Sequence, residues 1–269
     1  MPLLGPLLAA VTLASLTPWQ KAATLVVTTE RPRVFIEAAG ITFADQEGGL
    51  VKALPGAPPD RAARDYSTAQ QTRAAGAATA RALRGDDIDV DLAPVLDAAD
   101  GPLGSRQFRS PELGVAFARG LGAAACAKHF PGLGSAASST DERPHVDATI
   151  RPQDLAPYRA AIRAGLRCVM VGNAFYGTRF RASLEPSTYR LLRSLGFLGV
   201  AITDSLSLVH DAPVERWAPQ AVRAGADLVL FTSPSHAVRA IRALLPLARL
   251  GELDTHVLRV LRFRAVLHR

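Results

Sequence analysis

The sequence predicts an α/β fold of the (β/α) barrel type, formed by a single domain over residues 1–269. Short apolar runs with β-branched residues alternate with longer Ala-, Leu- and Arg-rich segments of helical character. Most of the apolar runs end in polar or charged residues, and no long linker rich in Gly, Ser or Pro interrupts the alternation. Apolar strands separated by helices are typical of parallel βα units, in which the strand ends lie on one rim and carry the chemistry.

The alternation defines each expected element in turn. Strands are expected at residues 23–29, 40–45, 87–94, 124–130, 168–173, 199–204 and 227–232. Helices are expected at residues 61–84, 111–122, 153–165, 186–195, 215–224, 235–248 and 254–267. The interval 30–40 is too short for a helix and a strand together. We therefore expect a shortened or imperfect barrel with about seven recognisable strands, whose open edge would favour a homo-oligomer.

The N-terminal segment 1–19 is apolar over most of its length. It lacks the basic residues that begin a signal peptide, and it is too short to span a bilayer. We expect a helix packed on the domain, no membrane span and a cytoplasmic protein. A signal-peptide remnant and export are the alternative.

Charge and cysteine content exclude several classes of function. The net charge of +7 comes almost entirely from arginine, since the chain has only three lysines. The arginines are dispersed through the helical segments and aromatic residues make up 6% of the chain, so we expect no nucleic-acid partner. Cys126 and Cys168 lie in apolar runs and are expected to be buried free thiols. Two cysteines are too few for a zinc site or a disulfide framework, and we expect no metal.

The candidate functional residues lie where the apolar runs end. Asp204 ends the run GVAITD, where a carboxylate can act as a nucleophile, a base or a metal ligand, or can cap a helix. Lys128 and His129 follow the run AACA and offer hydrogen-bond donors to a substrate. Asp45 and Arg106 add a carboxylate and a guanidinium for polar recognition.

Several sequence blocks, in this order, resemble glycoside hydrolase family 3, in its bacterial β-N-acetylglucosaminidase branch. The blocks are ADQEGG (44–49), VDLAPVLD (90–97), LGSRQF (103–108), AACAKHFPGLG (124–134), VMVGN (169–173), LRSLGFLGVAITDSLSL (192–208) and AGADLVL (224–230). The resemblance runs from about residue 20 to the C-terminus. KHFPG and the block ending in ITD are its most specific parts.

The resemblance implies a (β/α) barrel and retaining hydrolysis of a β-linked N-acetylhexosamine, such as a peptidoglycan fragment, without a cofactor. It implies that Asp204 is the nucleophile and that Asp45, Arg106, Lys128 and His129 hold the sugar hydroxyls. The family's acid/base is a histidine paired with an aspartate on a mobile loop that follows the KHFPG block.

The chain departs from the family pattern in that loop. The family's second histidine corresponds to Leu133, and its Asp and His correspond to Ser139 and Asp141. A family arginine that helps to bind the sugar corresponds to Ala53, and a histidine corresponds to Asn173.

Three interpretations of the altered loop are open. Asp141 or Glu142 could serve as the acid, because a carboxyl group with a raised pKa can do so. His145, with Asp147 two residues on, could supply a displaced dyad. The site could instead have lost hydrolysis and bind sugar only. Two further alternatives are an aldolase-type barrel that uses Lys128 as a Schiff base and a protein with a purely assembly role.

Overall fold

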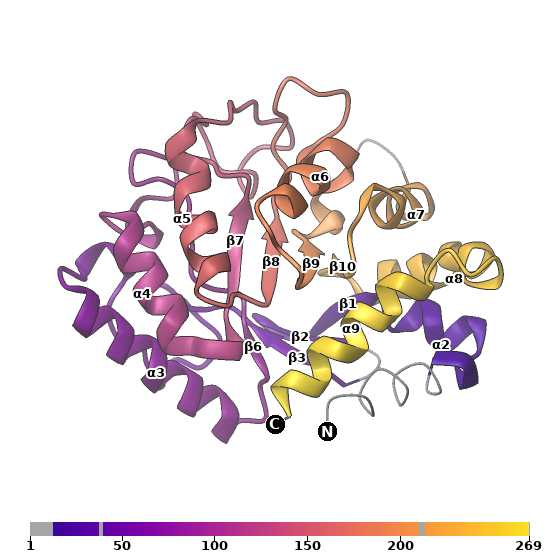
Figure 1. Ribbon diagram of the computed structural model, residues 1–269, viewed down its shortest axis with the longest axis horizontal. Coiled ribbons are helices and arrows are strands. Elements are labelled where there is room, and N and C mark those ends of the chain that lie inside the picture. The colour runs from indigo at the N-terminus through magenta and orange to yellow at the C-terminus, as the bar shows by residue number, and fades with distance from the viewer. Residues whose placement is uncertain (1–12, 38–39, 210–212, 269) are drawn as a thin grey trace.

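The computed structural model describes residues 13–37, 40–209 and 213–268, in which helices surround a central group of strands (Figure 1). The helices are α2 (Pro18–Ala23), α3 (Ala69–Gly85), α4 (Pro111–Leu121), α5 (Pro152–Arg163), α6 (Pro186–Ser194), α7 (Val214–Ala224), α8 (Pro234–Arg249) and α9 (Asp254–Leu267). None of the helices in the described ranges has the length and apolar character needed to cross a membrane. Much of the expected N-terminal segment, residues 1–12, lies outside the described residues.

The central strands pair mostly in parallel. They are β1 (Val26–Arg31), β2 (Val34–Glu37), β3 (Thr42–Ala44), β6 (Val90–Asp91), β7 (Cys126–Phe130), β8 (Cys168–Val171), β9 (Val200–Thr203) and β10 (Val229–Phe231). One sheet has the order β10-β1-β2-β3-β6 and another the order β7-β8-β9. Isolated parallel bridges, Asp91 to Ala125 and Ile202 to Leu228, connect the two sheets at both edges. The α/β class is confirmed, but the strand ladders do not form one continuous sheet.

The expectation of seven strands is wrong, because the interval 30–40 contains the additional strand β2. This strand is antiparallel to both β1 and β3, with Phe35 opposite Phe43. A tight turn at Pro32 and Arg33, where Arg33 has φ 60°, reverses the chain without a helix. The interval is too short for a helix and a strand, as expected, but a hairpin needs only a two-residue turn.

The cysteine expectation is also wrong, because Cys126 and Cys168 are bonded in a disulfide. The two residues are directly opposite in the parallel register of β7 and β8, with a Cα–Cα distance of 4.3 Å. Both are fully buried, as the apolar runs predict. The two sulfur atoms can bond because the register of β7 and β8 places the cysteines opposite each other. The sequence alone does not give this register.

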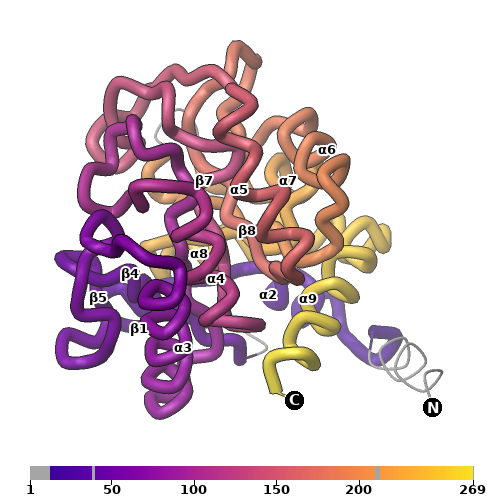
Figure 2. The backbone as a smooth tube through the Cα atoms, turned by 60° about the vertical axis from the view of Figure 1, so that its left-hand side comes forward, coloured from indigo at the N-terminus to yellow at the C-terminus, as the bar shows by residue number. Residues whose placement is uncertain are grey.

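Several helices pack against one another around the strands. Helix α3 packs on α4, and α4 packs on α5 (Figure 2). The expected helix 61–84 begins later than expected, at Ala69, where the Thr68 side chain accepts a hydrogen bond from the Gln71 N–H. The residues before it form a short 3-10 turn, Ala63–Asp65, and an extended segment.

Candidate functional site

A cavity of about 320 Å³ lies at the ends of the central strands and collects the main sequence-predicted residues. Asp45, Arg106, Lys128, His129 and Asp204 all line it. Each comes from a different strand end or loop, except Lys128 and His129, which are neighbours on β7. The strand-end signal therefore identified residues that share one site.

The segment after β3 places its carboxylates by strand alternation. Strand β4 (Gln46–Gly48) pairs with β5 (Val51–Lys52) in a small hairpin. Asp45 and Glu47 line the cavity, whereas the Gln46 side chain accepts a hydrogen bond from the Leu54 N–H at 2.9 Å. Gly48 has φ +99°, and a Cβ there would lie 2.2 Å from the Arg61 carbonyl oxygen. The glycine is required by this close approach.

Lys128 is the cation at the centre of the site. Its Nζ lies 2.6 Å from Asp45 Oδ1 and 2.5 Å from Glu47 Oε1. Burial lowers the pKa of Lys128, but the two carboxylates outweigh burial and hold the pKa above its usual value. A protonated lysine is not a nucleophile, so this environment disfavours the Schiff-base alternative.

Glu47 is a site residue that the sequence analysis did not identify. It forms a bidentate pair with Arg106, with distances of 2.8 Å to Nε and 2.9 Å to Nη2. Burial raises the pKa of Glu47, but Lys128 and Arg106 outweigh burial and lower the pKa to about 2. Its position two residues after Asp45 on the same face is the signal that could have identified it.

His129 is oriented by Asp97, which lies in the segment that follows β6. The His129 Nδ1 lies 2.8 Å from Asp97 Oδ2, and the Leu133 N–H donates to Asp97 Oδ1 at 2.7 Å. Burial lowers the pKa of His129, whereas Asp97 and Asp204 raise it, with a net increase. With Nδ1 engaged by Asp97, Nε2 is the ring nitrogen left for another partner.

Asp204 follows β9 and is 8% exposed. Its Oδ1 accepts a hydrogen bond from the Ser205 N–H at 2.7 Å. Burial raises the pKa of Asp204, while His129 opposes the increase. Asn173 steadies the turn by donating from Nδ2 to the Ser205 carbonyl oxygen at 3.0 Å. The residue that replaces a family histidine thus supports the backbone next to Asp204.

The altered loop places only one of the three acid/base candidates at the cavity. Asp141 lines it, with Oδ2 3.4 Å from Arg106 Nη1, whereas Glu142 and His145 do not line it. His145 stacks on Phe175 with ring centroids 4.3 Å apart, and its Nε2 lies 3.3 Å from Asp147 Oδ2. The side chains of His145 and Asp147 are 65% and 78% exposed, so this pair faces solvent.

Arg33 is a second cavity residue that the sequence interpretation missed. It lies on the β1–β2 turn, and its carbonyl oxygen accepts a hydrogen bond from the Asp45 N–H at 2.9 Å. Within the described part of the chain, no carboxylate pairs with its guanidinium. Ala53, at the position of the family arginine, does not line the cavity. The described residues contain no group of three or more His, Cys, Asp or Glu placed to hold a metal ion.

Comparisons with known proteins agree on one family. Residues 3–263 match the family described as "Glycosyl hydrolase family 3 N terminal domain". The chain is 36% identical over 220 residues to an uncharacterized secreted glycosyl hydrolase of Arthroderma benhamiae, covering 71% of this chain and 62% of that protein. It is 32% identical over 237 residues to a β-hexosaminidase of Vibrio cholerae, covering 78% of this chain and 71% of that protein.

A solved structure shows the same similarity in three dimensions. The β-N-acetylhexosaminidase of Beutenbergia cavernae has a TM-score of 0.73 and 28% identity, over 82% of this chain and 77% of that chain. The chain thus spans less than the full length of these relatives.

Proposed function

The chain belongs to glycoside hydrolase family 3, and on that basis we propose that it hydrolyses terminal β-linked N-acetylhexosamine with retention of configuration. The observation that carries the proposal is the cavity that unites Asp204 with Asp45, Arg106, Lys128 and His129. A buried carboxylate beside several hydrogen-bonding groups suits a sugar ring whose hydroxyls need many partners.

In the first step, an Asp204 carboxylate oxygen attacks the anomeric carbon. The bond from that carbon to the leaving oxygen breaks, and Asp141 donates its proton to the leaving oxygen. The product is a glycosyl ester on Asp204 and a free aglycone. Asp141 is assigned because it is the acid/base candidate that lines the cavity, whereas Glu142 and His145 do not.

In the second step, Asp141 acts as the base. It removes a proton from water, and the water oxygen attacks the anomeric carbon of the ester. The ester bond breaks, which restores the Asp204 carboxylate and releases the sugar. Asp141 regains its proton from the water.

The remaining groups bind the sugar. Asp45, Arg106, Lys128 and His129 exchange hydrogen bonds with the ring hydroxyls. Arg33 supplies a guanidinium from the β1–β2 turn, in place of the family arginine that is absent at Ala53. The unpaired state of Arg33 among the described residues supports this role, because a guanidinium without a carboxylate partner is available to a ligand.

A second candidate function is sugar binding without turnover. The observation that favours it is the contact between Asp141 and Arg106, which occupies the one acid/base candidate at the cavity. In that case Asp204 and the four binding residues form a recognition site, and the altered loop is the reason that hydrolysis is lost.

Turnover of 4-nitrophenyl N-acetyl-β-glucosaminide by the full chain and by Asp204→Asn separates the two functions. Hydrolysis by the wild type well above the variant is expected for an enzyme. Calorimetry with N-acetylglucosamine on both proteins measures binding independently. Binding without turnover would favour the recognition function, and neither binding nor turnover would exclude both for this sugar.

Five finer assignments belong to the same proposal. We propose that residues 1–269 form one domain and that its eight central strands make a modified (β/α) barrel, in which β2 replaces a βα unit. The substrate is a cell-wall type glycoside. The protein acts in the cytoplasm, with export as the alternative, and forms a homo-oligomer.

A further inference from the structure

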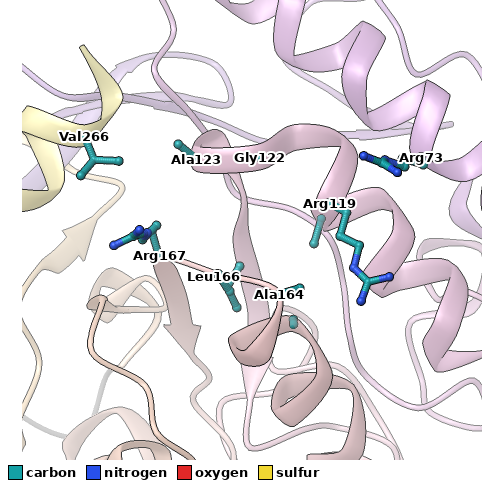
Figure 3. Close-up of a pocket in the computed structure, with 11 residues that line it drawn as sticks. Arg73, Arg119, Gly122, Ala123, Ala164, Leu166, Arg167 and Val266 are labelled. Carbon is teal, nitrogen blue, oxygen red and sulfur yellow. The ribbon is translucent and has the colours of Figure 1, made fainter. Parts of the chain in front are cut away.

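A second charged cavity lies away from Asp204, on the side of the molecule where α4, α5 and α9 end. It has a volume of about 510 Å³, and Figure 3 shows Arg73 and Arg119 on one side and Arg167 with Val266 on the other. Two more cavities adjoin it. One shares Arg73 and Arg119 with it, and the other shares Arg167 and Val266 and adds Arg259 and Arg262. We call these three adjoining cavities the arginine groove.

The groove is unbalanced in charge. Among the described residues that line its three cavities there is no Asp or Glu. The side chains of Arg73, Arg119, Arg167 and Arg262 are exposed and form no ion pair with any residue in the described ranges. The fifth arginine of the groove, Arg259, contacts Asp227. The other four arginines are therefore free to bind an external anion.

Helix ends do not account for this arrangement. Arg119 lies in the last turn of α4, where carbonyl groups attract a cation. Arg73, however, lies near the start of α3, Arg167 lies beyond the end of α5, and Arg262 lies within α9. Attraction to helix C-termini explains one of the four positions and does not explain the other three.

We propose that the arginine groove binds an extended anion with repeated phosphate groups. Guanidinium groups bind phosphate oxygens in pairs, and their spread over three adjoining cavities suits a ligand with several negative charges in a row. A nucleic acid fits less well, because stacking of bases needs accessible aromatic faces. Phe263 is the aromatic residue among those that line the groove, and it is only 5% exposed.

Calorimetry of the full chain with tripolyphosphate and with orthophosphate tests the proposal. Saturable binding of tripolyphosphate, tighter than that of orthophosphate, is expected. The double variant Arg119→Ala, Arg167→Ala should weaken tripolyphosphate binding about tenfold or more, through the loss of two charge-assisted contacts. Circular dichroism confirms that the variant is folded, which is expected because both side chains are exposed.

A matched control removes the same charge elsewhere. Arg81→Ala, Arg159→Ala changes two exposed arginines of α3 and α5 that do not line the groove, and it should leave binding unchanged. Equal weakening by the two double variants would overturn the proposal, because it would show a response to net charge alone. Absence of saturable binding, or tighter binding to phosphatidylglycerol vesicles or to polyglutamate than to tripolyphosphate, would also overturn it.

Discussion

Glu47 forms ion pairs with two cationic side chains of the candidate site, Lys128 and Arg106. All three side chains are largely removed from water. Removal of one partner from a buried ion pair leaves the other charge uncompensated, which costs more than the pair itself contributes. Lys128 and Arg106 therefore depend on Glu47 for their positions in the cavity.

Replacement of Glu47 by Gln should destabilise the fold at neutral pH by about 3 kcal/mol, because it removes the negative charge between two buried cations. The pKa of Glu47 is lowered from 4.5 to about 2 in the folded protein. Its contribution to stability is therefore complete above the unfolded value and is lost as pH falls from about 4.5 to about 2. Urea unfolding at pH 7 and pH 3 measures both effects.

The exposed Glu30→Gln is the matched control for that substitution and should change little. If Glu47→Gln unfolds at the same urea concentration as the wild type at pH 7, the network does not hold the site together. The wild type should lose more stability than Glu47→Gln between pH 7 and pH 3.

Arg33 offers a test at the mouth of the cavity. Arg33→Ala should raise KM for the N-acetylglucosaminide about tenfold with a smaller effect on kcat, because it removes a charged hydrogen-bond donor that binds substrate and transition state alike. Steady-state kinetics provide the measurement. Arg31→Ala changes an exposed arginine of the same hairpin that does not line the cavity. Equal effects of the two substitutions would assign Arg33 no specific role.

At the scale of the elements, the loop from Gly134 to Asp147 decides which chemistry the site can perform. Pro144 and His145, in the second half of this loop, are held by contacts outside the cavity. Arg181 donates to the Pro144 carbonyl oxygen at 3.3 Å, and His145 stacks on Phe175. The part of the loop that reaches the cavity carries Asp141, so that residue is the natural subject of a test.

Asp141→Asn should lower kcat about 10²–10⁴-fold, because loss of general acid/base catalysis has an effect of that size. Glu142→Gln, at the next position, does not line the cavity and should retain wild-type kcat. Steady-state kinetics with the chromogenic substrate, which include the second step, compare the two variants. The assignment fails if Asp141→Asn keeps full activity or if Glu142→Gln loses it.

The strand ends were predictable because an apolar run followed by Asp, Lys or His is a local pattern. Asp204, Lys128 and His129 are therefore in one cavity as expected. Strand β2, the disulfide and the role of Glu47 were not predicted. Strand β2 is only four residues long, which is too short for a clear sequence pattern. The disulfide and the role of Glu47 depend on register and pairing between distant segments.

The two charged regions of the molecule differ in how their cationic side chains are paired with carboxylates. In the strand-end cavity most cations are paired with carboxylates, which presets the positions of hydrogen-bonding groups for a polar ligand. In the arginine groove, Arg73, Arg119, Arg167 and Arg262 have no such partners among the described residues, and only Arg259 contacts a carboxylate, that of Asp227. A neutral sugar suits the first region and an anion suits the second, so the two proposals can fail independently.

The proposed hydrolysis requires a covalent bond between Asp204 and the sugar. Mass spectrometry of the full chain, quenched during turnover of 4-nitrophenyl N-acetyl-β-glucosaminide, detects this bond. We expect an adduct of one N-acetylhexosaminyl group on the peptide that contains Asp204, and no adduct in Asp204→Asn. An adduct on another residue, or turnover that gives a product of inverted configuration, would contradict the proposal.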